Sequence, residues 1–238
     1  MVVRTIARLT LATLFGHRRG LLLYVLPAVL IGLSLLLTFT VDDKGDLAKA
    51  IMQQFGLAVI LPLVALIAAT GAISSEIDDG SIVYLLSKPI NRSTIILTKA
   101  LVALGVIFGL GVVPIVVSGL VLDPGDVQTA LAFGVGALAA GIAYTAIFVA
   151  LSVMSGNAVT IGLFYSLLWE SLMGQYVDGA KVLSIQQWSL ALTRQLADVP
   201  VDAAVKLPLA TLLLLAVTLA GLGLAISRLR SLTLSSAE

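Results

Sequence analysis

Glu170 is the residue of this sequence best placed to do chemistry, because it is the one acidic side chain well inside an apolar run. Trp169 precedes it, and Gln175 and Tyr176 follow. Ionisable groups at membrane depth are costly and mark functional positions, so the pattern predicts a place on a pathway or gate. A protonated carboxyl, or one paired with a polar side chain such as Gln53 or Gln54, fits equally well.

The other polar residues give little support for catalysis. A hydrolase needs a nucleophile with a base, paired carboxylates or metal ligands, whereas Ser155 has no histidine within an apolar run and His17 is peripheral. The chain has no cysteine, which excludes thiolate metal sites. A P-loop needs Gly-Lys followed by Ser or Thr, and no lysine here is followed by either. We expect no enzyme active site and no bound cofactor in this chain.

The composition predicts the elements that position these residues. Of 238 residues, 59% are hydrophobic and 11% are charged, and the mean hydropathy is +1.11. About 20 apolar residues cross a bilayer as a helix, so we expect an all-α membrane protein forming one transmembrane domain over residues 1–238. Six stretches are long enough to span: 20–41, 51–73, 95–121, 127–151, 158–176 and 207–227.

Basic residues predict the orientation, because cytoplasmic loops are enriched in Lys and Arg. With the N-terminus inside, nine of the 14 basic residues fall on the cytoplasmic side. Both termini and the 74–94 connection are then cytoplasmic, and the 177–206 connection is outside. Residues 1–19 place arginines such as Arg4 and Arg8 opposite Ile6 and Leu14. This pattern favours a helix in the membrane interface, with a basic tail that only sets topology as the alternative.

The 74–94 connection reads as a short capped helix. Asp79 or Ser81 can accept from the free N–H groups of a first turn, and Pro89 ends the helix. Three apolar residues lie between them on one face at helical spacing: Ile82, Leu85 and Leu86. The segment is therefore an amphipathic element presented to the cytoplasm between two spans.

This segment resembles the loop after the second span of type 2 ATP-binding-cassette (ABC) export permeases, the type V exporter-like family. That loop has an acidic residue, a Gly-Thr or Gly-Ser step, a double leucine, Ser-x-Pro, a hydrophobic residue, x-Arg, and then a lysine. The matching positions here are Glu76, Gly80-Ser81, Leu85-Leu86, Ser87-Lys88-Pro89-Ile90, Arg92 and Lys99. The layout of an interfacial helix, six spans and a partly helical outer segment is similar too.

The resemblance implies a permease subunit of an exporter in the cell membrane, whose coupling helix docks on a separate ATPase subunit. ATP and Mg would bind that partner, and a second permease copy or homologue, with membrane lipid, would complete the assembly; no nucleic acid is expected. A structural or regulatory membrane protein, whose loop merely covers two span ends, is the alternative. The residues implied in coupling are Glu76, Asp78, Asp79, Gly80, Ser81, Ile82, Leu85, Leu86, Ser87, Lys88, Pro89, Arg92 and Lys99.

The outer segment contains a second periodic stretch, 183–196. Apolar residues including Ile185 and Trp188 lie at helical spacing opposite Gln186 and Gln187. An interfacial helix anchored by Trp188 and a helix that dips back into the outer leaflet both fit, the second by resemblance to related exporters. Two groups of glycines in the spans permit close helix contacts: Gly105 and Gly109, and Gly134, Gly136 and Gly141. Internal packing is the expected role of such glycines, and a dimer seam is the alternative.

Overall fold

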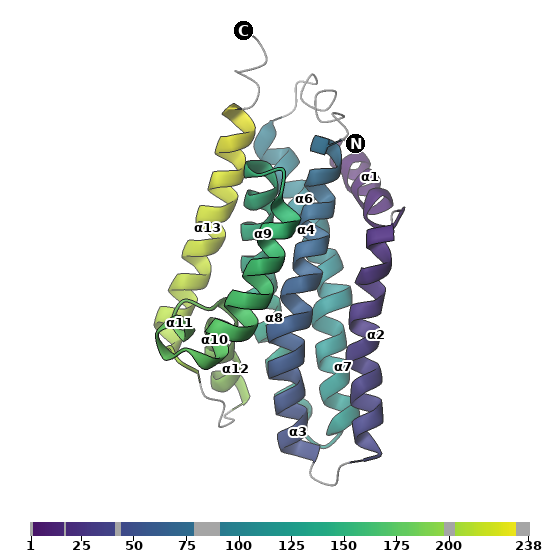
Figure 1. Ribbon diagram of the computed structural model, residues 1–238, viewed down its shortest axis with the longest axis vertical. Coiled ribbons are helices and arrows are strands. Elements are labelled where there is room, and N and C mark those ends of the chain that lie inside the picture. The colour runs from purple at the N-terminus through teal and green to yellow at the C-terminus, as the bar shows by residue number, and fades with distance from the viewer. Residues whose placement is uncertain (1, 17, 41–43, 79–90, 198–202, 232–238) are drawn as a thin grey trace.

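The computed structural model describes residues 2–16, 18–40, 44–78, 91–197 and 203–231. Within these ranges the regular structure is entirely helical. The long helices lie side by side in one elongated bundle (Figure 1). The predicted class, an all-α membrane protein, is confirmed by this architecture and by its apolar spans.

The helices follow one another with three π-helical segments, labelled η. The first half of the chain comprises α1 (Val2–Gly16), α2 (Arg18–Thr38), α3 (Lys44–Ala50), η1 (Ile51–Ile60), α4 (Leu61–Asp78), α6 (Arg92–Ile107), η2 (Phe108–Val112) and α7 (Val113–Leu122). The second half comprises α8 (Val127–Met154), α9 (Ala158–Phe164), η3 (Tyr165–Met173), α10 (Gly174–Tyr176), α11 (Asp178–Lys181), α12 (Ile185–Ala197) and α13 (Leu207–Ser231).

Five helices of the described residues are long and apolar enough to cross a membrane. They are Gly20–Thr38, Lys44–Ile73, Arg92–Leu122, Val127–Met154 and Leu207–Leu229. Each overlaps a predicted span. The remaining predicted span, 158–176, is not among the five, although it is helical throughout as α9, η3 and α10.

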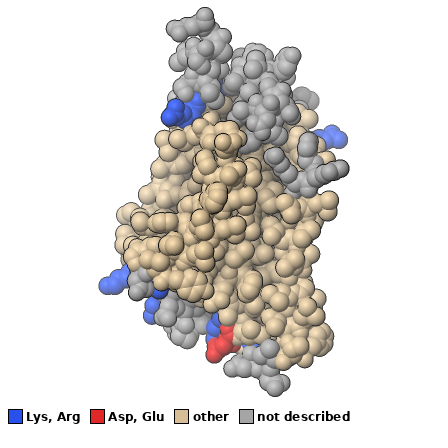
Figure 2. Space-filling model, viewed as in Figure 1, with Lys and Arg blue, Asp and Glu red and all other residues tan. Residues whose placement is uncertain are grey.

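The two ends of the bundle hold different elements. The helix α1, the end of α4, the start of α6 and the last turn of α13 lie at one end, here called the α1 end (Figure 1). The elements α3, α10, α11 and α12 lie at the opposite end, here called the α12 end (Figure 1). On the face drawn in Figure 2 the charged side chains lie toward these two ends, and the surface between them is uncharged. Such a band suits the hydrocarbon core of a bilayer.

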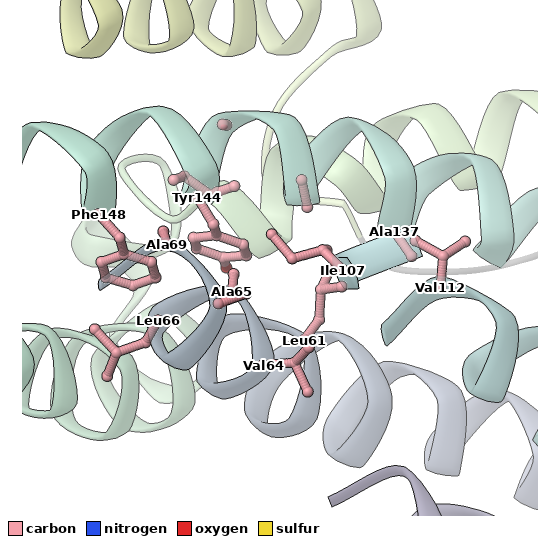
Figure 3. Packing of buried hydrophobic residues seen from close by; sticks show 14 of the residues in the cluster. Leu61, Val64, Ala65, Leu66, Ala69, Ile107, Val112, Ala137, Tyr144 and Phe148 are labelled. Carbon is pink, nitrogen blue, oxygen red and sulfur yellow. The ribbon is translucent and has the colours of Figure 1, made fainter. Parts of the chain in front are cut away.

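The core lies where α4 packs against α8. In Figure 3, Tyr144 and Phe148 of α8 point toward α4, where Ala65 and Ala69 leave room for the rings. In a bilayer the hydrophobic effect does not drive helices together, because the lipid tails are as apolar as the side chains. Close van der Waals packing therefore holds such contacts together. Most of α4 is buried, whereas α2 and α13 mostly face outward. The helix α4 is therefore the central element of the bundle.

Glycines of α8 make the close approaches that we predicted. A Cβ on Gly134 would meet Val116, and one on Gly141 would meet Ile107 at 3.0 Å. At Gly136 a Cβ would lie 3.0 Å from the backbone oxygen of Ser189, in α12. For these three glycines the prediction of internal packing is confirmed.

Gly105 and Gly109 differ, and for them the prediction is wrong. A Cβ on either would meet nothing within 4 Å, because this face of α6 and η2 is turned away from the bundle core. The helix α1 packs nearby against α6 and α4, with Ile6 and Leu14 buried. Arg8 is exposed. The predicted helix within residues 1–19 is thus present; its place in a membrane interface remains a prediction.

Candidate functional site

Glu170 lies at the centre of a buried polar cluster at the α12 end. Its side chain is 0% exposed and accepts four hydrogen bonds. Oε1 accepts from the Tyr165 hydroxyl at 2.7 Å and from the Ile185 N–H at 3.1 Å. Oε2 accepts from the Ser184 hydroxyl at 2.6 Å and from the Gln186 N–H at 3.2 Å. All four lone-pair positions of a carboxylate can be used in this way.

The same bonds close the N-terminus of α12. The first N–H groups of a helix have no partner within it. In α12 those of Ile185 and Gln186 donate to Glu170, that of Gln187 donates to Ser184 Oγ at 3.4 Å, and that of Trp188 donates to the Ser184 carbonyl at 3.2 Å. Glu170 is therefore a long-range cap of α12, supplied from a separate helix.

A tight return of the chain brings α12 back to Glu170. The helix η3 ends at Met173, and α10 and α11 turn the chain over eight residues, 174–181. The indole N–H of Trp188 donates to the Val182 carbonyl at 2.7 Å, which fixes the turn to the helix that follows it. Ser184 then stands directly before the first residue of α12, where a hydroxyl is a favoured cap.

The first turn of α12 is fixed from two further sides. Gln186 Nε2 donates to the Gln53 carbonyl of η1 at 3.0 Å. Gln187 Nε2 donates to the Gly174 carbonyl at 3.2 Å, and its Oε1 accepts from the Ala204 N–H at 3.4 Å. Three separate parts of the chain thus hold this helix start through buried amides.

Glu170 belongs to the π-helix η3, which packs against the π-helix η1. Ser171 Oγ donates to the Ala58 carbonyl of η1 at 2.8 Å and to the Ser166 carbonyl at 3.0 Å, five residues back. A π-helix, in which residues five apart are hydrogen-bonded, is rare and occurs frequently at functional sites. The two irregular segments therefore meet at the carboxylate cluster.

An aromatic stack connects the cluster to the core. Phe148 packs edge-on against Tyr165 with ring centroids 6.1 Å apart, and stacks on Tyr144 at the same centroid distance. The Oε1 of Gln186 is buried and has no hydrogen-bond partner within the described residues. Buried polar atoms without a partner are unusual in folded proteins, so the cluster retains unused hydrogen-bonding capacity.

A cavity of about 520 Å³ opens beside the start of α12. Its lining includes Gln53, Gln175, Lys181 and Gln187. The wall is thus polar and carries one cation, close to the amides that hold α12. Across the described part of the chain, no group of three or more His, Cys, Asp or Glu residues is arranged to hold a metal ion.

Several predicted site residues take positions that the sequence did not indicate. The suggestion that Gln53 or Gln54 pairs with Glu170 is wrong, because the four donors to Glu170 come from elsewhere and Gln54 is exposed. Trp188 is only 4% exposed, and its indole N–H donates to the Val182 carbonyl. The polar face predicted for the outer helix is wrong at Gln186 and Gln187, which are buried because their amides bond to neighbouring backbone.

A second buried charge lies at the α1 end. Lys99 of α6 is 2% exposed and its Nζ donates to the Ala72 carbonyl of α4 at 2.6 Å. A charge-assisted bond of this kind is stronger than a neutral one. It ties together the two helices that flank residues 79–91, which form the middle of the predicted coupling loop, 74–94.

The remaining predicted coupling residues are only partly described. Arg92 begins α6, and Glu76 and Asp78 belong to the last turn of α4. Nine predicted positions lie outside the described residues: Asp79, Gly80, Ser81, Ile82, Leu85, Leu86, Ser87, Lys88 and Pro89.

Three residues of the Glu170 cluster were missed by sequence reasoning. Tyr165, five residues before Glu170, carries a signal, because a π-helical turn brings residues five apart together. Ser184 carries another, because a serine directly before a periodic segment is a cap signal. Gln186 carries none, because its partners depend on the return of the chain.

A bundle of long apolar helices with charged ends is a polytopic membrane protein. A family model described as "ABC-2 family transporter protein" matches residues 28–229. The chain therefore belongs to the ABC-2 family and is a membrane permease of an ABC transporter, a family whose members associate with an ABC ATPase subunit. The resemblance found in the sequence is confirmed. No curated protein matches the chain.

Proposed function

We propose that this chain is the permease subunit of an ABC exporter that is driven by ATP hydrolysis on a separate subunit. Family membership over residues 28–229 is the observation that carries the proposal. The sequence offers no P-loop of its own, since no Gly-Lys is followed by Ser or Thr. ATP and Mg then bind the partner, and the chain itself is not an enzyme. Two permeases, alike or paired, enclose the pathway.

Six membrane crossings fit the arrangement of the bundle. Segment 158–176 runs from the α1 end, where α8 finishes, to the α12 end (Figure 1). As an ideal α-helix its 19 residues would extend about 28 Å, and the more compact π-helix η3 shortens this to a length still comparable with a bilayer core of about 30 Å. An even number of crossings also agrees with α1 and the last turn of α13 lying at the same end. Most basic residues belong to that end, which we assign to the cytoplasm.

Coupling to the ATPase is assigned to residues 79–91 and to the two helices that flank them. The bond from Lys99 to the Ala72 carbonyl supports this, because it joins α4 to α6 next to the segment. A push on the segment is then passed to both helices together. The central position of α4 transfers the movement to the bundle core.

Docking is tested with the double variant Leu85→Asp and Leu86→Asp. Charges in an apolar docking surface abolish co-purification of the ATPase with the permease. A matched control places the same charges at the other end, at the exposed residues Leu183 and Leu196, and retains the ATPase. Undiminished co-purification of the first variant would overturn the docking assignment.

Transmission is tested with Lys99→Met, which keeps the apolar stem and removes the ammonium group. The ATPase still co-purifies, but ATP-driven transport falls by roughly 5- to 150-fold, the usual range of coupling between sites. Transport is measured in vesicles with substrates identified by mass spectrometry of copurified ligands. Transport equal to wild type, at equal ATPase recovery, assigns Lys99 to stability alone.

The helix α12 is assigned as a cap over the outer end of the pathway, held by Glu170. The buried first turn of α12 and the polar cavity beside it support this. Glu170→Gln weakens the cap because an amide offers one oxygen in place of two. If this variant retains full ATP-driven transport at normal expression, Glu170 has no role in the pathway.

A further inference from the structure

A second cavity, of about 450 Å³, lies on the side of the bundle toward the α1 end. It is lined by Leu11 and Phe15 of α1, Tyr24 of α2, and Gly105 and Gly109 of α6 and η2, together with other aliphatic residues of α6 and η2. Its wall is almost wholly hydrocarbon, in contrast to the polar cavity beside α12. We call it the α1–α6 groove.

Two glycines make this groove hollow. At Gly105 and Gly109 a Cβ would meet nothing within 4 Å, whereas the glycines of α8 are filled by neighbouring helices. Both are exposed, and they lie four residues apart on one face of the helix. The space they leave is within the 300–1,000 Å³ range of ligand sites.

The groove begins at one membrane interface. The span of α2 starts at Gly20, and Tyr24 is about one turn inside it. Tyr24 is 54% exposed, and its ring contacts that of Phe15 with centroids 5.6 Å apart. Aromatic rings of this kind mark the head-group level. From there the groove follows α6 and η2 from Val102 to Leu110, toward the middle of the membrane.

A cation lies one helical turn before the groove residues along α1. Arg8, Leu11 and Phe15 are three and four residues apart in α1, so they share one side of that helix. All three are exposed. The guanidinium of Arg8 is therefore about one turn from the groove wall, and guanidinium groups bind phosphate with paired hydrogen bonds.

We propose that the α1–α6 groove binds one acyl chain of an anionic phospholipid, with the phosphate held by Arg8. A hydrocarbon wall, an aromatic rim and a cation in that order match a phospholipid from tail to head group. A second copy of this chain would not explain the cation beside the rim. The site is independent of the transported substrate and of the outer cap, and depends only on membrane residence.

The groove is tested by filling it. Gly105→Leu places a side chain into open space, so the fold is retained. The matched control is Gly223→Leu in α13, an exposed glycine whose Cβ would also meet nothing within 4 Å. The full chain in detergent is titrated with phosphatidylglycerol and with phosphatidylcholine of the same acyl chains, and bound lipid is counted by native mass spectrometry.

Wild type and Gly223→Leu retain one tightly bound phosphatidylglycerol per chain, and Gly105→Leu loses it. Arg8→Gln weakens the affinity for phosphatidylglycerol roughly tenfold, as expected for one charge-assisted contact. This variant binds phosphatidylcholine as wild type does. Equal lipid retention by all variants overturns the proposal. A change in oligomer mass in Gly105→Leu, with lipid unchanged, overturns it in favour of a subunit contact.

Discussion

Two carboxylates cap helix N-termini at the α12 end, in different surroundings. Asp126 caps α8 from the residue directly before it, and its Oδ1 accepts from the Thr129 N–H at 3.0 Å near the surface. Glu170 caps α12 from 14 to 16 residues away, fully buried and with four donors. Capping by a carboxylate thus occurs once between neighbouring residues and once between residues that the tertiary fold brings together.

The difference shows what burial demands of a charge. A partly exposed carboxylate can complete its hydrogen bonds with water, so donors from one neighbouring residue, Thr129, are sufficient at Asp126. A buried carboxylate must find all its partners in the protein. At Glu170 these donors belong to two elements, η3 and the start of α12, and the carboxylate therefore joins them. We expect substitutions at Glu170 to act on the outer structure and those at Asp126 to act on one helix end.

The largest effect is expected for Glu170→Ala. It leaves the Ser184 and Tyr165 hydroxyls and two N–H groups of α12 without their acceptor, and each buried donor left unpaired costs about 1–3 kcal/mol. The thermal midpoint in detergent falls far more than for Asp126→Ala. Equal shifts for the two variants would contradict the contrast between the buried and the exposed cap.

A smaller loss is expected for Ser184→Ala. Its hydroxyl donates to Glu170 and accepts from the Gln187 N–H, so removal costs about 0.5–2 kcal/mol, the usual value of a cap. The exposed Ser227 supplies the control, since Ser227→Ala changes stability by less than about 0.5 kcal/mol. If both serine variants unfold at the wild-type temperature, Glu170 holds α12 without its hydroxyl donor.

For Asp126→Ala the loss is at the low end of the capping range, about 0.5 kcal/mol, because water replaces the lost acceptor at the surface. Asp126→Asn, which keeps an acceptor oxygen, restores most of it. Thermal unfolding of the two variants side by side measures the difference. A loss at Asp126 as large as that at Glu170 would show that α8 also depends on its cap.

The smallest expected effect is a pH dependence of the stability that Asp126 contributes. Hydrogen bonds from Thr129 hold the pKa of Asp126 below its ordinary value of 3.8. A carboxyl whose pKa is lowered by folding stabilises the fold above that ordinary value, and the contribution is lost as the pH falls through the lower, folded value. The gap in thermal midpoint between wild type and Asp126→Asn therefore narrows below about pH 4. If the difference in thermal midpoint stays constant with pH, the protonated carboxyl of Asp126 caps α8 as well as the carboxylate does.

The spans were predictable from the sequence, because hydropathy over about 20 residues needs no tertiary information. The Asp126 cap is also local and can be read from residues three apart. Glu170 was recognised by its depth, but its partners were not, since they depend on the turn at 174–181 that returns the chain. Gln186 and Gln187 were assigned to a polar face for the same reason. The open face at Gly105 and Gly109 could not be predicted either, because the spacing of small residues does not indicate whether another helix packs against that face.

The closeness of Glu170 to its donors along the chain has a consequence for biogenesis. Tyr165, Ser184 and the first N–H groups of α12 all lie within 16 residues of the carboxylate. Contacts that close a loop of this size form early, because little chain entropy is lost in closing a short loop. The hairpin from η3 to α12 can then enter the bilayer as a preassembled unit, with the hydrogen bonds to the Glu170 carboxylate made before it meets lipid.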